Sequence, residues 1–353
     1  MAKDFATMED SNRSSNPSIH DVSTPSRRTL LRGMAATTFL APLAGVATLS
    51  GCATGVGSGA PLLGFQSVPV GNADTVVVPE GYSVQVIAPW GDPVGLSGES
   101  AAFKPDGSNS AADQAVQFGM HHDGIHFFAQ NGSQSGLLVM NHEYVDDGLL
   151  HRDGLANWSA EKVRKAQAAH GVTVCEVAQK AGRWEVVRPS PWARRITAAT
   201  PMAVGGPAAG HALMKTAADP SGRRVLGMLN NCGSGITPWG TYLTCEENFI
   251  FYFKGPDQPD AHQRRWGLRK GDPVGYRWHA HDERFDATKH PNEINRFGWV
   301  VEIDPLNPSS VPVKRSALGR AAHEGATVAL TKSGRAVVYM GEDARFEYIY
   351  KFV

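Results

Sequence analysis

One cysteine and two adjacent carboxylates lie within a short stretch in the middle of the chain. Cys232 belongs to a glycine-loosened turn, and Glu246 and Glu247 end the β-type run at residues 241–244. Neighbouring carboxylates repel, and burying them is costly unless a cation or a hydrogen-bond donor lies between them. A metal ion is the usual solution, and a thiolate with carboxylates offers it both soft and hard ligands. The alternative is a disulfide between Cys232 and Cys245 across a hairpin, and the residues alone leave both open.

Two other β-rich runs also begin near a glycine and end on acid. Residues 136–144 reach Glu143, and residues 334–343 reach Glu342 and Asp343. Glu143, Glu247 and Glu342 occupy matching places, although their unequal spacing makes this a weak repeat. Strands repeated around a closed ring deliver their ends to a common axis, where one acid per unit forms a cluster of oxygen ligands. Calcium prefers such a cluster.

A histidine-rich turn precedes the first of these runs. His121, His122 and Asp123 lead into a glycine, and their side chains are of types that bind metals. An Asp-Gly turn with an Asx-type hydrogen bond accounts for the same residues.

The composition favours many short strands over a helical bundle. The chain has 353 residues, with 38 glycines, 22 prolines and only 19% charged residues. Its 34 basic residues balance its 34 acidic ones, so no net charge attracts it to nucleic acid or to an anionic membrane. We therefore expect an all-β fold and no nucleic-acid partner.

A few elements can be placed within that fold. Residues 76–88 predict the first folded strand, with a turn at Pro79–Gly81. One inserted helix is predicted near residues 159–170, with Ser159 as its N-cap. A hairpin between residues 172–177 and 184–187 follows it, with Cys175 as a packing residue.

The N-terminal region has the pattern of an export signal. Residues 1–25 are polar and are expected to be disordered. Residues 26–52 carry paired arginines and a weakly apolar core, which is typical of twin-arginine export. The run before Cys52 also fits a lipoprotein cleavage box, so either a lipid anchor at Cys52 or an ordinary cleavage site is possible. Residues 53–75 form a linker rich in glycine and serine.

The run from Asn231 to Asn248 resembles the PhoX-type alkaline phosphatases, and the resemblance extends from about Gly81 to Val353. It implies a β-propeller with ferric iron and calcium at its centre, which hydrolyses phosphate monoesters outside the cytoplasm. One cysteine supplies a thiolate to iron, and acidic residues hold the remaining positions. No serine or threonine nucleophile is then required. The implied location is periplasmic or at the cell surface.

The resemblance also implies roles for individual residues. His323-Glu324-Gly325 matches the family and makes Glu324 a ligand, although a turn with a left-handed Gly325 explains the same residues. Arg345 could neutralise a carboxylate or contact phosphate. The implied catalytic residues are therefore Cys232, Glu324 and Arg345. The implied metal ligands are Cys232, Glu143, Glu246, Glu247, Glu324, Glu342 and Asp343.

The end of the chain qualifies this interpretation. Family members continue well beyond the point where this sequence stops, and Val353 ends a strand-like run. We therefore expect residues 76–353 to be the N-terminal part of an incomplete propeller, poorly folded and weak or inactive when expressed alone. The alternative function is a non-catalytic, exported propeller that binds calcium and presents a surface to partners.

Overall fold

The computed structural model describes residues 65–98 and 101–353. The chain divides into two compact units, Met1–Val84 and Gln85–Val353. The predicted disordered segment, the export signal and Cys52 lie outside the described residues, as does most of the linker. No helix in the described ranges is long and apolar enough to cross a membrane.

The first predicted strand is not formed. Residues 76–88 carry no strand, and Val84 and Val86 are exposed. The turn is present, since Tyr82 N donates to Pro79 O at 3.0 Å. Alternating apolar residues make a strand only where a neighbouring strand and a core accept them, and here only Ala88, at the end of the run, packs against a buried cluster.

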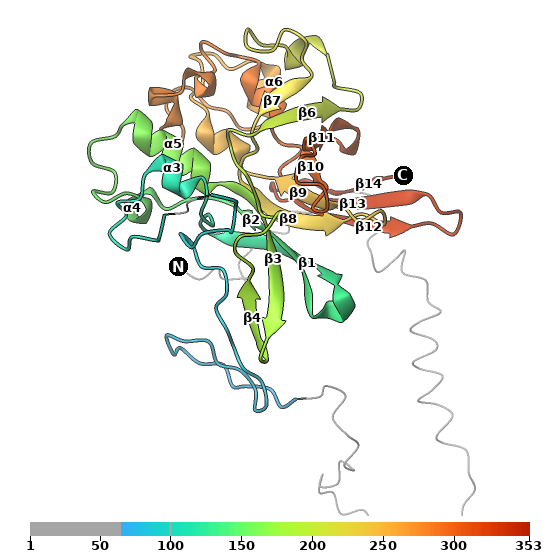
Figure 1. Ribbon diagram of the computed structural model, residues 1–353. Helices are drawn as coiled ribbons and strands as arrows, with labels where there is room; N and C mark the ends of the chain where they lie inside the picture. The colour runs from blue at the N-terminus through green and yellow to red at the C-terminus, as the bar shows by residue number, and fades with distance from the viewer. Residues whose placement is uncertain (1–64, 99–100) are drawn as a thin grey trace, which may run out of the picture. The chain divides into compact units, whose positions relative to one another are not determined.

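The second unit contains three sheets joined by short helices, so the predicted all-β class is confirmed only as a mostly-β fold (Figure 1). The first sheet is antiparallel in the order β1-β2-β3-β4, with β5 also paired to β3. Its strands are β1 (His122–Gln130), β2 (Ser135–His142), β3 (Gly171–Lys180), β4 (Arg183–Val186) and β5 (Arg194–Ile196). The β3–β4 pair is the predicted hairpin, and Cys175 is buried in it.

The second sheet has the order β7-β6-β11-β10-β9-β8, in which only the β11–β6 pair is parallel. Its strands are β6 (Pro201–Gly205), β7 (Arg224–Leu226), β8 (Asn231–Ile236), β9 (Tyr242–Glu246), β10 (Val300–Ile303) and β11 (Val313–Arg315). The third sheet has the order β12-β13-β14, with strands β12 (His323–Leu330), β13 (Ala336–Glu342) and β14 (Ile349–Phe352).

Short helices fill the connections. The predicted helix is confirmed as α5 (Ala160–Ala169), and the Ser159 side chain accepts from Lys162 N as its N-cap. The other α-helices among the described residues are α3 (Ala111–Gln114), α4 (Asp147–Leu150) and α6 (Ala261–Arg265). The 3₁₀ turns in the same part of the chain are η2 (Asn131–Ser133), η3 (Ala212–Met214), η4 (Phe249–Tyr252), η5 (Trp278–Ala280), η6 (Glu283–Phe285), η7 (Glu293–Arg296) and η8 (Ser316–Leu318).

Strand β8 is the meeting point of the three sheets, because it contacts β1 and β2 of the first and β12 of the third (Figure 1). Two glycines permit the approach of β12. A Cβ atom at Gly233 would lie 1.8 Å from the carbonyl oxygen of Glu324, and one at Gly235 would lie 1.8 Å from that of Ala326. The Cys-Gly-Ser-Gly sequence therefore places β8 in direct backbone contact with β12.

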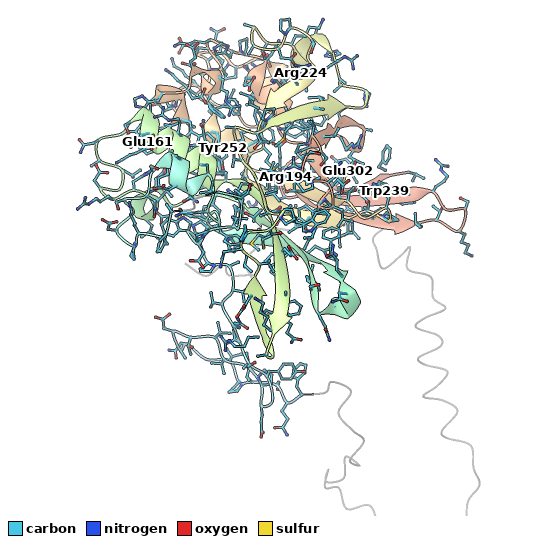
Figure 2. The ribbon with its side chains drawn as sticks, viewed as in Figure 1. Glu161, Arg194, Arg224, Trp239, Tyr252 and Glu302 are labelled. Carbon is cyan, nitrogen blue, oxygen red and sulfur yellow. The ribbon has the colours of Figure 1, made fainter. Side chains whose placement is uncertain are left out.

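Aromatic packing anchors the chain on either side of β9. Before β9, Trp239 Nε1 donates to Glu302 Oε1 at 2.7 Å, and both residues are labelled in Figure 2. After β9, the fully buried ring of Tyr252 stacks on Tyr276 with 4.5 Å between centroids. These contacts therefore flank β9 on both sides along the chain.

Candidate metal centre

The three hairpins β1–β2, β8–β9 and β12–β13 share one irregularity. In each, the first strand carries extra residues close to its start: Asp123 and Gly124 lie opposite Asn141, Cys232 and Gly233 opposite Cys245, and Glu324 has no opposite partner. A bulge of this kind re-aims the side chain of the extra residue. The sequence at each bulge is a polar residue, an acid or cysteine, and then glycine: His-Asp-Gly, Asn-Cys-Gly and His-Glu-Gly.

In each hairpin an acidic residue directly follows the last residue of the second strand. Glu143 follows β2, Glu247 follows β9 and Asp343 follows β13. Because successive side chains of a strand point to opposite faces of the sheet, the residue before each of these acids faces away from the side that the acid faces. Those preceding residues, His142, Glu246 and Glu342, pair with His122, Asn231 and His323 in matching registers.

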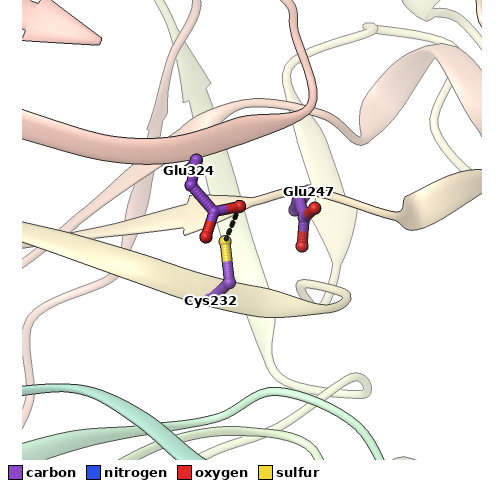
Figure 3. Close-up of side chains that lie close together, drawn as sticks. All are labelled: Cys232, Glu247 and Glu324. Carbon is purple, nitrogen blue, oxygen red and sulfur yellow. Dashed lines mark hydrogen bonds between the residues drawn. The ribbon is translucent and has the colours of Figure 1, made fainter. Parts of the chain in front are cut away.

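Cys232, Glu247 and Glu324 form the centre of the resulting cluster, and their side chains point toward one another (Figure 3). One potential ligand atom from each lies within 4.8 Å of the others. The Cys232 thiol donates to His323 O at 3.1 Å and lies 3.8 Å from Glu324 Oε2. Cys232 and Glu247 are buried, whereas Glu324 is exposed and leaves the cluster open on one side.

The electrostatics of this cluster favour a cation. Burial, followed by the negative charge of Asp123, raises the pKa of Glu143 to about 7. Burial, followed by the charge of Glu324, raises the pKa of Glu247 to about 8. Burial and then the charges of Glu247 and Glu324 raise the pKa of the Cys232 thiol. Within the described residues, no lysine or arginine forms an ion pair with Cys232, Glu247 or Glu324.

The donor set therefore fits metal ions. A thiolate suits iron or another transition metal, and the surrounding carboxylates suit a hard cation. A metal charge would reverse the pKa shifts, because it favours the ionised thiolate and carboxylates.

Metal-free protein should lose stability with rising pH because of these carboxylates. The ordinary pKa of both glutamates is 4.5, so from there to about pH 8 the folded state retains protons that the unfolded chain has released. The Glu247→Gln variant cannot acquire that charge. We expect its advantage over the parent protein in unfolding free energy to grow from about pH 5 to about pH 8, as measured by urea unfolding in chelator.

Taking the difference in unfolding free energy between the two proteins cancels the contribution of titrating groups that both contain, including the buried histidines. A pH-independent difference between the two proteins would contradict the assigned electrostatics.

Comparison with known proteins identifies the chain. The family model described as alkaline phosphatase PhoX matches residues 63–353. The chain belongs to the PhoX alkaline phosphatase family. The structure is similar to that of Pseudomonas fluorescens PhoX in complex with vanadate, a transition-state analogue, with 49% sequence identity and a TM-score of 0.78. The match covers 82% of this chain and 50% of that one, so the chain spans about half the length of that PhoX. A search of curated proteins gave no match.

The structure brings together most of the ligands implied by the PhoX resemblance. Glu247 is affected by the charges of Glu324, Asp343 and Glu143, so these four acids are neighbours. Cys232 completes the group. The predicted convergence of strand ends therefore describes the arrangement in this PhoX chain, with Asp343 rather than Glu342 directly beyond β13.

Glu246 does not lie in the cluster. Its fully buried carboxylate accepts from Lys314 Nζ at 2.8 Å, from Leu229 N at 3.0 Å and from Trp299 N at 3.0 Å. Glu342 lines the cavity beside the cluster, and its Oε1 accepts from Ala322 N at 2.9 Å. Both side chains secure the strands that carry Glu247 and Asp343.

Arg345 lies at a cavity beside the cluster. This cavity has a volume of about 320 Å³, and Glu247 and Asp343 also line it. The arginine is exposed. The structure thus places it where it can face a ligand bound at Glu247 and Asp343.

The alternative disulfide is absent. Cys175, Cys232 and Cys245 are all free and buried. Cys245 packs in an apolar cluster with Leu243 and Val300, whereas the bulge turns Cys232 toward Glu324. The two thiols therefore face different surroundings.

Two further residues belong to the site: Asp123, which the sequence offered as either a metal ligand or a turn residue, and Asn141. The charge of Asp123 contributes to the raised pKa of Glu143, and the His-Asp-Gly pattern that it shares with Asn-Cys-Gly and His-Glu-Gly favours its place at the site over a plain turn. Asn141 is buried and donates from Nδ2 to Cys232 O at 2.5 Å. Its Oδ1 accepts from Tyr242 and Thr244, so a satisfied buried amide fixes the cysteine-bearing bulge.

Proposed function

We propose that this chain hydrolyses phosphate monoesters with a centre of ferric iron and calcium. The observation that carries the proposal is the convergence of Cys232, Glu247 and Glu324, with Glu143 and Asp343 beside them, from three equivalent hairpins. The complex of the similar Pseudomonas fluorescens PhoX with vanadate supports phosphoryl transfer as the chemistry.

The proposal gives the residues of this chain distinct tasks. Cys232 would hold iron, and the carboxylates around it would supply the remaining ligands for iron and calcium. Bound metal ions would neutralise phosphate oxygens and stabilise charge on the transferring group. Arg345 orients the phosphate from the cavity side. Asn141 and the Glu246–Lys314 pair keep the ligands in place.

We further propose that the three sheets are successive blades of a β-propeller, since equivalent strand ends meet at one centre. The signal at residues 26–52 supports export by the twin-arginine machinery to the periplasm or cell surface. A membrane association would then come only from a lipid on Cys52.

The direct test is hydrolysis of a simple aryl phosphate by the purified chain with iron and calcium, before and after treatment with a calcium chelator. Because the chain alone is expected to be weak, we expect low activity that falls by at least about 100-fold on chelation and returns when calcium is added. Stoichiometric calcium binding without hydrolysis would instead favour the non-catalytic propeller. Activity that is unaffected by metal removal would refute the proposed centre.

A further inference from the structure

The cavity beside the metal cluster has an apolar wall. Phe249, Ile250 and Trp266 line it together with the cluster residues Glu247 and Asp343. Its volume of about 320 Å³ is at the lower end of the range for small-molecule pockets. Because Glu247 and Asp343 belong to the cluster, the cavity opens directly beside it.

The wall is held firmly in place. Phe249 is buried and begins η4, two residues after Glu247. The cluster residue Glu247 and the apolar wall therefore belong to one short segment of the chain. Its ring lies 6.1 Å from that of Trp266, centroid to centroid. The guanidinium of Arg320 lies 4.8 Å from the ring of Phe249 and 4.9 Å from that of Trp266.

Arg320 is itself fixed, because its guanidinium donates to Phe297 O and to Ile294 O, each at 2.8 Å. The indole of Trp266 is therefore preorganised, and ligand binding would not have to immobilise it.

Acids and arginines both line the cavity: Glu342 and Glu347 join the cluster acids, and Arg265 and Arg345 supply the positive charge. Arg265 pairs with Glu347 at 2.8 Å, which neutralises it and links α6 to the segment before β14. Arg345 has no ion pair within the described residues. The cavity therefore offers the Arg345 guanidinium near the cluster and, beyond it, an aromatic wall whose rings are backed by the guanidinium of Arg320.

We propose that this cavity is the leaving-group subsite and that Trp266 gives it a preference for phosphate monoesters of aromatic alcohols. The inference rests on the proposed phosphatase function and adds a substrate class to it. An aromatic leaving group gains contact with a fixed ring and releases water from apolar surface, whereas a small alkyl group reaches little of the wall.

The test compares kcat/KM for 2-naphthyl phosphate and for glycerol 3-phosphate in the metal-loaded full chain. Trp266→Ala is expected to reduce the naphthyl value by about fivefold to tenfold and the glycerol value by less than about twofold. Trp266→Phe should restore most of the preference, because it retains a ring. Trp239→Ala is the matched control, since Trp239 is 61% exposed and does not line the cavity.

The outcomes separate the two claims. Equal losses on both substrates, or no loss on either, would overturn the subsite while leaving the phosphatase function intact. Failure of the parent chain to hydrolyse either substrate would overturn the proposed function and the subsite with it. Thermal unfolding of each variant shows whether a uniform loss reflects misfolding.

Discussion

Replacing Cys232 by serine is expected to lower iron affinity by at least about 100-fold, because loss of a direct ligand should exceed the effect of losing a residue that only supports one. Serine is close to cysteine in size, and its hydroxyl can donate to His323 O as the thiol does. It does not ionise as readily and is a harder donor, so the change removes the sulfur while disturbing little else. Iron content after dialysis and the thiolate-to-iron absorption band both report the effect.

The matched control is Cys245→Ala on the neighbouring strand. Cys245 is fully buried in an apolar cluster, so its loss should reduce stability without removing a metal donor. Iron content should therefore follow Cys232 and not Cys245. Equal iron content in Cys232→Ser and the parent protein would contradict the assignment of this thiol.

Replacing Lys314 by methionine is expected to destabilise the fold by about 3–5 kcal/mol, the usual effect of leaving a buried charge without its partner. Lys314 and Glu246 are both fully buried, and their side chains meet at 2.8 Å. Methionine preserves much of the packing against Phe297 but leaves the carboxylate with only two backbone donors, Leu229 N and Trp299 N. Urea unfolding measures the difference.

Two further variants sharpen this prediction. The double variant Lys314→Met with Glu246→Gln removes both charges and should recover part of the loss. Arg315→Met changes the adjacent residue, whose ion pair with Glu302 is partly exposed, and should cost less than about 1 kcal/mol. A loss below that value for Lys314→Met alone would show that the buried pair does not carry the stability assigned to it.

Local signals predicted the elements that depend on nearby residues. The α5 helix begins at Ser159 because its side chain caps the helix, and that signal is contained in the sequence. The β3–β4 hairpin follows from its alternation and turn. The strand expected at residues 76–88 failed, because a strand also requires a partner that lies elsewhere in the chain.

The residues that would bind metal could also be predicted only in part from the sequence. Sequence reasoning named Cys232 and Glu324, but it named both Glu246 and Glu247, and both Glu342 and Asp343, without separating the members of each pair. Strand alternation separates each pair, but only once the register and the bulges are known, because one inserted residue reverses which side chains face the cluster.

Lys314 was also beyond prediction. It lies 68 positions from Glu246, and only the sheet order β11-β10-β9 brings the two together. Neither residue carries a local pattern that indicates the other.

The most direct test of the metal centre is anomalous scattering at the iron edge from crystals of the iron- and calcium-loaded chain. We predict an iron peak bonded to Cys232 Sγ, at about the 2.3 Å typical of metal–thiolate bonds, with carboxylate oxygens of Glu247 and Glu324 beside it. An iron peak away from Cys232, or no peak while that thiol remains unbound, would contradict the account.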